Sequence, residues 1–571
     1  MKASKKRGFT IIELVIVIAV IAILAAVLIP TFANIIQKAN VANDVALARN
    51  MNTILIADEA TNGRSTDMYD VLIALEQGGF KLENLNPRAD GNVFAWDKAN
   101  NQIVYLEKGS AKPIFQAKEI GDNKGDLYIT TRKAEVFADY PGYSYYFASD
   151  ISGNITLDEG SCLDTGEFAL NGDVSVKTNK DVEIQGTING TITVDSASGK
   201  ITNYSVVNNV VIVNTASTSY HERGHVGAME IKDSLKGKVV LENDAYVEKL
   251  TNNKTNGTVE STGYVKAVEG KDTSVTATQS GYVLEIGTYD QLVNFRNKVN
   301  AGASYSGMTV KLTADIDISE RAWTPIGAAY RDKIDANAKV FQGTFDGQGH
   351  KVTGLTNTGF KISSVYSGRN DTTPHEYKEY VFGLFGSVYN ATIKNIVMAN
   401  VNIDLACDEK EKVVGDSVGA IVGFAAGDET TGVTIENCKV LSGSIVGYDA
   451  VAGIIGRTYS AKTTINKCEN AATVTAIRRA GGILGFTSGG KGTRVTAITN
   501  CKNSGNVKQT GTPTTDPAGE GGINYYMVAG LAICQKGNSP EIDITGSTNT
   551  GTVTLTVSAG GKNKSDTVWY Y

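Results

Sequence analysis

Residues 8–30 read GFTIIELVIVIAVIAILAAVLIP and directly follow a short basic leader that ends in KKR. Within this run the only charged residue is Glu13. The run is long enough to span a bilayer, which takes about 20 residues, and it exceeds the roughly 7–15 apolar residues of a cleaved secretory signal. An ionised side chain in hydrocarbon costs at least ~2.5 kcal/mol, so a carboxylate at this place indicates a function. The basic leader favours the cytoplasmic side, which places the rest of the chain outside.

Together, Gly8–Phe9, the apolar run and Glu13 resemble the N-terminus of type IV pilins and pseudopilins. The resemblance implies that a prepilin peptidase cuts after Gly8 and that Phe9 is then N-methylated. It also implies that Glu13 pairs with the N-terminal amine of a neighbouring subunit during assembly, and that Pro30 is the family's mid-helix proline. A cleaved signal and a plain membrane anchor both explain the apolar run, but neither explains Gly8–Phe9 with Glu13 at this offset.

The amino-acid composition of the chain argues against several classes of function. The chain has 571 residues, a net charge of −6 and a pI near 5.5, which argues against a nucleic-acid surface because such surfaces are basic. It has 61 glycines but 9 prolines, a texture typical of short strands with tight corners. Only four histidines occur, and the six cysteines form no CxxC pair. The C-terminal SDTVWYY is neither a hydrophobic tail nor a sorting motif, so we expect the N-terminal helix to be the anchor.

Helical periodicity continues beyond Pro30, so we predict a helix over 9–58 with the membrane span at about 9–32. Pro30 would kink this helix or mark the membrane exit. A small head is predicted over 59–149. It contains a helix at 67–80, capped by Asp67 and stopped by Gly78–Gly79, and then a hairpin at 93–108 with its turn at 97–101. The order helix–hairpin, with Trp96 before the turn, resembles the heads of pilin-like proteins from Gram-positive bacteria.

Residues 150–284 alternate apolar and polar side chains, as in DVSVKTNKDVEIQGTINGTITVDS. Val, Ile and Thr at every second position predict strands with one buried face. Asn-Gly, Ser-Gly and Lys-Gly pairs supply the turns. The pattern leaves two topologies open for this segment, a short β-solenoid and a sandwich.

The segment 285–560 contains a repeat, followed by a tail at 561–571. Five copies align at residues 391–403, 433–445, 463–474, 497–507 and 543–553. A period in this range predicts stacked repeats in which aligned residues form columns. One predicted column is Ile393, Ile435, Ile465, Ile498 and Ile544, and a second is Cys438, Cys468 and Cys501 with Ser547 at its end. Parallel Cβ vectors in such a column suit packing better than disulfides.

Each copy is accompanied by a small-residue apolar box. The boxes begin at Gly383, Ala420, Gly453, Gly482 and Gly530. They resemble the GLUG repeat of large bacterial surface proteins, and residues 288–318, 322–327 and 341–355 are similar to the first coils of such modules. The resemblance implies a right-handed parallel β-helix over about 285–555.

Four motifs are candidate sites. His221–His225 matches HExxH, but its zinc chemistry needs a helix and the flanks read as strand and turn, so we predict no zinc site. Asp315 and Asp317 share a strand face, which we expect to be solvated. Asp346 beside two glycines reads as an Asx turn. The tyrosine-rich residues 138–147 suit either a contact surface or a β core.

The sequence therefore predicts an N-terminal transmembrane helix, a small α+β head and a mainly β remainder that ends in a β-helix. We expect an exported, membrane-tethered pilin-like protein, a minor pilin or filament-associated adhesin, with the bulk of the chain extracellular. Expected partners are the prepilin peptidase, other pilin-like subunits, the membrane, and an extracellular carbohydrate or protein. No catalytic residue, metal or cofactor is predicted. A polysaccharide-acting enzyme on the same scaffold and a membrane-anchored spacer remain the alternatives.

Overall fold

The computed structural model describes most of the chain. The described residues are 11–65, 67–110, 112–120, 127–131, 133–158, 161–195, 198–215, 220–254, 259–272, 275–278, 281–319, 322–327, 338–357, 377–378, 381–405, 412–413, 417–428, 430–459, 462–488, 496–511, 527–535, 542–555 and 568–570. The chain divides into two compact units between Glu183 and Ile184. The predicted boundaries of the head and of the β-rich segment stay predictions.

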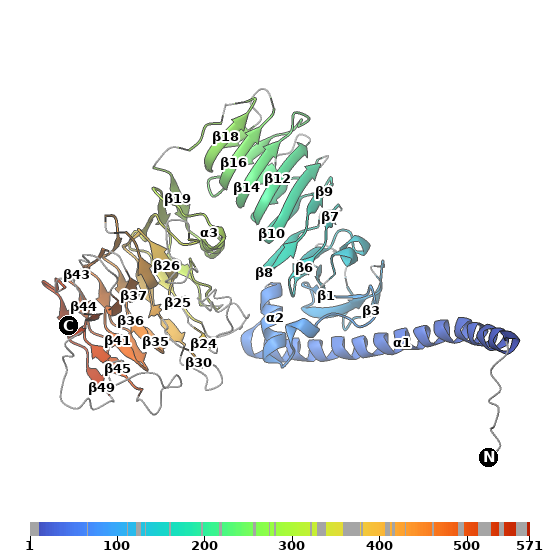
Figure 1. Ribbon diagram of the computed structural model, residues 1–571, viewed down its shortest axis with the longest axis horizontal. Coiled ribbons are helices and arrows are strands. Elements are labelled where there is room, and N and C mark those ends of the chain that lie inside the picture. Colours follow the sequence, from blue (N-terminus) through green and yellow to red (C-terminus); the bar gives the residue numbers. More distant parts are fainter. Residues whose placement is uncertain are drawn as a thin grey trace, which may run out of the picture. The chain divides into compact units, whose positions relative to one another are not determined.

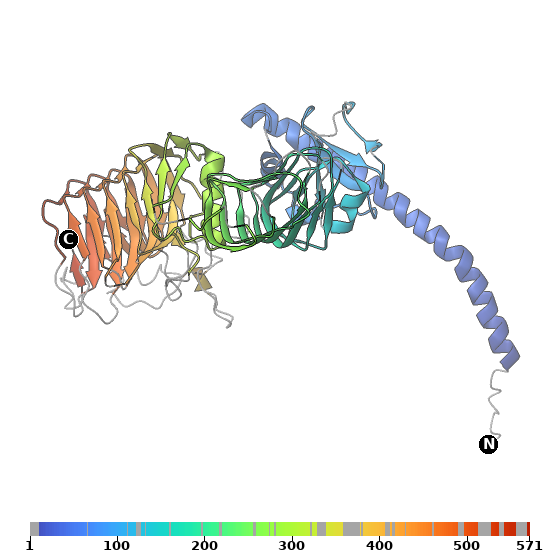
Figure 2. The same ribbon diagram turned by 90° about the horizontal axis from the view of Figure 1, so that it is seen from above.

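The first unit begins with one long helix, α1 (Ile11–Asn62), which appears as a single curved helix in Figure 2. It runs through Pro30 without ending, and Thr31 Oγ1 donates to the carbonyl of Val27 in that turn. The predicted end at residue 58 was wrong by four residues, since the helix ends at Asn62.

The head follows the predicted order. α2 (Met68–Gln77) is capped by Asp67, whose carboxylate accepts from the Asp70 amide, and Gly78 ends it. β1 (Val93–Asp97) and β2 (Gln102–Leu106) form the predicted antiparallel hairpin, with Asp97 opposite Gln102. The remaining elements of this unit are η1 (Leu82–Asn84), β3 (Pro113–Phe115), β4 (Leu127–Thr131), η3 (Ala134–Asp139), β5 (Ser144–Phe147), β6 (Ile151–Ser152), β7 (Ile155–Leu157), β8 (Leu163–Asn171) and β9 (Val174–Val176).

The tyrosine-rich segment belongs to the core of the head. Tyr140, Tyr143, Tyr145 and Tyr146 are all buried. The Tyr145 hydroxyl donates to the carbonyl of Tyr140, and the ring of Phe137 lies 4.3 Å from the Tyr145 ring. The alternative that this segment is a contact surface is therefore wrong, because all four tyrosine side chains are buried.

The first part of the second unit consists of parallel strands in two ladders, whose strands alternate along the chain. Figure 1 shows the strands of the longer ladder side by side. The long ladder holds β12 (Val206–Asn214), β14 (His225–Ile231), β16 (Tyr246–Asn252) and β18 (Tyr264–Gly270), and β10 (Val182–Asp195) precedes it. The short ladder holds β11 (Ile201–Asn203), β13 (Tyr220–Glu222), β15 (Val239–Leu241) and β17 (Val259–Ser261). Parallel pairing excludes an antiparallel sandwich for these strands.

The second part begins with β19 (Val283–Ile286) and α3 (Tyr289–Ala301), a helix that the sequence analysis did not predict. Thr288 caps its start by accepting from the Gln291 amide, and Gly302 ends it with a φ of 127°. Strands of the following repeats then pair in five parallel sheets, whose strands stack one behind another in Figure 2.

Each repeat contributes one strand to most of these sheets. Sheet 1 contains β19, β20 (Thr309–Leu312), β22 (Thr344–Asp346), β27 (Thr392–Lys394), β33 (Val433–Glu436), β38 (Thr463–Asn466) and β43 (Thr496–Thr499). Sheet 2 contains β21 (Ile316–Asp317), β23 (Lys351–Thr353), β28 (Val397–Ala399), β34 (Lys439–Val440), β39 (Glu469–Asn470), β44 (Lys502–Asn503) and β48 (Thr548–Asn549). Sheet 3 contains β29 (Val401–Asp404), β35 (Gly443–Gly447), β40 (Thr473–Ala476), β45 (Val507–Gln509) and β49 (Val553–Leu555).

Two further sheets meet at the apolar boxes. Sheet 4 contains β25 (Val381–Phe382), β31 (Ser417–Gly419), β36 (Ala450–Ala452), β41 (Arg479–Gly481) and β46 (Met527–Ala529). Sheet 5 contains β26 (Phe385–Tyr389), β32 (Val422–Ala426), β37 (Ile455–Tyr459), β42 (Leu484–Ser488), β47 (Ala532–Gln535) and the antiparallel β50 (Val568–Tyr570). The short strands β24 (Tyr377–Lys378) and β30 (Lys412–Val413) pair separately.

The glycines of the boxes are required by the close approach of backbones. A Cβ at Gly456 would lie 2.3 Å from the Val418 nitrogen, which is closer than real Cβ contacts come.

The corner between sheets 1 and 2 requires a left-handed backbone conformation. Asn437, Lys467 and Asn500 adopt φ values of 51–54° there, in the left-handed region that Asn tolerates better than most residues.

The predicted columns are confirmed. Ile393, Ile435, Ile465 and Ile498 are in register and fully buried, while Ile544 is partly buried at the end. Each thiol of the cysteine column donates to the carbonyl of the preceding repeat, as Cys468 does to Ile435 and Cys501 to Ile465. Ser547 makes the same contact with Ile498 O. Cys407 lies outside the described residues.

Candidate functional site

The N-terminal half of α1 is an exposed apolar surface. Large side chains from Ile11 to Ile36 are exposed, and Glu13 lies among them in the first turn. By length and composition, this is the one helix among the described residues that is suited to cross a membrane. The predicted processing residues Gly8 and Phe9 lie outside the described residues.

The C-terminal half of α1 is attached to the head by two buried polar side chains. The carboxylate of Asp44 accepts from the Arg88 and Ala89 amides at 2.9 Å and from the Tyr105 hydroxyl at 2.8 Å. Asn52 exchanges two hydrogen bonds with the backbone of Ile103 in β2, at 2.7 and 2.9 Å. The helix therefore has an exposed apolar half and a docked half.

The HExxH motif of the sequence lies on two strands and the corner between them. His221 and Glu222 belong to β13, and His225 begins β14. The two imidazoles face different carboxylates: His221 Nδ1 lies 2.7 Å from Glu242, and His225 Nε2 lies 3.7 Å from Glu248. This arrangement agrees with the strand and turn expected from the flanks.

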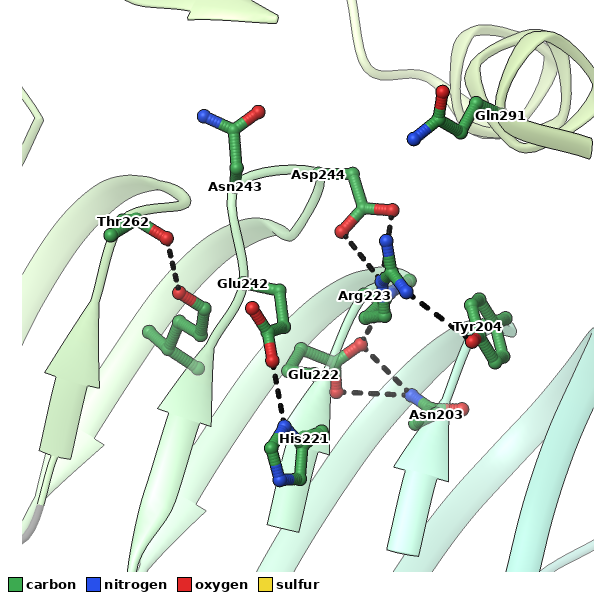
Figure 3. Close-up of polar contacts among 12 residues, drawn as sticks. Asn203, Tyr204, His221, Glu222, Arg223, Glu242, Asn243, Asp244, Thr262 and Gln291 are labelled. Atoms are coloured by element: carbon green, nitrogen blue, oxygen red, sulfur yellow. Dashed lines mark hydrogen bonds and ion pairs between the residues drawn. The ribbon is translucent and has the colours of Figure 1, made fainter. Parts of the chain in front are cut away.

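Glu222 is the centre of a buried polar cluster, shown in Figure 3. Its carboxylate accepts from Tyr220 Oη at 2.6 Å, from Asn203 Nδ2 at 3.0 Å and from the Gly224 amide at 2.7 Å. Burial raises the pKa of Glu222 to about 7, although these donors oppose the shift. The carboxyl group of Glu222 therefore stays protonated in the folded state until the pH approaches neutrality.

The neighbouring corner at 243–244 joins this cluster to the second part of the unit. Asp244 accepts from Arg223 Nε at 3.1 Å, and the Arg223 guanidinium lies over the Tyr204 ring (Figure 3). The buried ammonium of Lys298, from α3, contacts the Asp244 carbonyl. Burial lowers the pKa of Lys298 to about 8. Sequence reasoning missed this contact because its partners are far apart in the chain.

The carboxylates of the other candidate sites each accept a hydrogen bond from a backbone amide. Asp315 is exposed and accepts from the Lys351 amide, and Asp317 is exposed and accepts from the Ser319 amide. Ile316 and Ile318 are buried, so the solvated face that we expect for Asp315 and Asp317 is confirmed. Asp346 accepts from the Gln348 amide at 3.0 Å, which confirms the Asx turn.

A second buried ionic cluster lies between sheets 4 and 5. Asp449 accepts from Arg479 at 2.5 Å and from Arg457 at 2.6 Å, and both guanidinium groups lie over the Phe486 ring. The arginines hold the pKa of Asp449 below its usual value against its burial. The Arg478–Arg479 pair was the sequence signal for this cluster, but its partner Asp449 is a full repeat away.

Among the described residues, no group of three or more His, Cys, Asp or Glu side chains is arranged to hold a metal ion. In both polar clusters, most of the hydrogen-bonding groups have partners within the cluster itself. The clusters therefore suit a role in holding repeats together.

Comparison with known proteins points to the N-terminal region. A family described as the prokaryotic N-terminal methylation motif matches residues 3–29. The fimbrial protein of Moraxella nonliquefaciens is 44% identical over 136 residues, which cover 22% of this chain and 86% of that protein. The type IV major fimbrial protein FimA of Dichelobacter nodosus is 33% identical over 112 residues, covering 19% of this chain and 69% of FimA.

Other relatives cover less of their own length. In another FimA of Dichelobacter nodosus, 35% identical, the matched region is 57% of the protein. Halomucin of Haloquadratum walsbyi is 29% identical over 170 residues, which are 29% of this chain and 2% of halomucin. No solved structure matches the chain significantly.

Proposed function

Because this chain belongs to the type IV pilin family, we propose that it is an exported, membrane-tethered subunit, a minor pilin or filament-associated adhesin, that displays its stacked strands outside the cell. The observation that carries the proposal is the difference between the two halves of α1. Its residues up to Ile36 expose apolar side chains, whereas Ala48, Met51 and Leu55 are buried against the head. A helix of this kind can leave the bilayer and pack beside other helices while its head stays folded.

In this proposal the prepilin peptidase cuts after Gly8, and Phe9 becomes the methylated N-terminus. Glu13 then neutralises the amine of Phe9 on a neighbouring subunit. Each group offsets the desolvation cost of the other in an apolar surrounding. The partners of α1 are therefore the peptidase, the membrane and other pilin-like subunits.

We further propose that sheets 1–5, over residues 285–560, form a right-handed parallel β-helix of the GLUG type. The support is the register of the parallel strands and the continuous isoleucine column. Such a stack would serve as a rod that binds an extracellular carbohydrate or protein. Catalysis is not part of the proposal, and the polar clusters serve to hold the repeats together.

Co-expression with the wild-type subunit tests the role of Glu13. Glu13→Val should insert into the membrane as well as wild type, because it removes a charge from the apolar run. It should enter purified filaments far less than a tagged wild-type copy in the same cells. Ile12→Val, in the same turn, is the matched control and should enter normally. Equal incorporation of both variants would favour a membrane anchor outside any filament.

A further inference from the structure

We draw no further inference here: the strongest candidate, the buried cluster of Asp449, Arg457 and Arg479 between sheets 4 and 5, in which the Nε of Arg457 has no hydrogen-bond partner among the described residues, belongs to the cluster already described, and nothing in the described part of the structure shows what could reach these almost fully buried side chains.

Discussion

Ile465 lies directly opposite Ile498 in neighbouring parallel strands, and both side chains are fully buried. Their contact is one step of a column that runs through the repeats and that the alignment of the sequence predicts. The column makes the stability of each repeat depend on its two neighbours.

Replacing Ile465 by Asp should place an unpaired carboxylate in this dry column and cost several kcal/mol. Because repeats contact only their neighbours, limited proteolysis should open the chain first near 450–500, while the head over 60–110 stays protected. Thr464→Asp, at the neighbouring and partly exposed position, should change the free energy of unfolding by no more than ~0.5 kcal/mol. Equal tolerance at both positions would mean that the register is wrong.

Asp44→Asn should loosen the attachment of α1 to the head. The amide group of Asn presents a donor where the Asp44 carboxylate accepts from two backbone amides and Tyr105. A buried donor without an acceptor costs about 1–3 kcal/mol, so the melting temperature of the head should fall. Thr53→Ala, on the exposed side of the same helix, serves as the control and should melt like wild type.

Glu222 should make the second unit less stable as the pH rises towards 7. The folded state keeps the proton of Glu222 up to a pKa of about 7, whereas the unfolded chain loses it near the ordinary glutamate pKa of 4.5. Stability from this group is therefore complete below pH 4.5 and is lost by about pH 7, a change on the order of 3 kcal/mol.

Glu222→Gln should remove that decline, because glutamine does not titrate. Urea unfolding followed by circular dichroism at several pH values between 4.5 and 8 measures the difference. Parallel pH profiles for the variant and wild type would show that Glu222 titrates normally.

The parts of the fold that the sequence predicted are those with a local signal. α2 has its cap Asp67 and its stop Gly78, and the β1–β2 hairpin has a turn between alternating apolar residues. The repeat columns were predictable because stacking turns sequence alignment into spatial register. α3 was not predicted, although Thr288 and Gly302 are ordinary helix signals, because residues 288–318 were assigned by their resemblance to the first coils of a repeat module.

The polar clusters were not predictable, because each depends on residues brought together from distant positions. Lys298 reaches the Asp244 carbonyl from α3, and Arg479 reaches Asp449 from the next repeat. A single buried lysine or arginine carries no local pattern that names its partner. The HExxH pattern shows that a local motif can also occur without its usual structure. Here the motif, which binds zinc only on a helix, lies on two strands, and its histidines face different carboxylates.

The central claim, that the chain is processed and assembled as a pilin, is tested most directly by the intact mass of the mature protein from membranes and filaments. The account predicts a chain that begins with N-methylated Phe9, and it predicts that Gly8→Ala leaves the leader in place because the peptidase must fit the backbone at this junction. A mature chain that begins at Met1, or one cut after an Ala-x-Ala site, would contradict it.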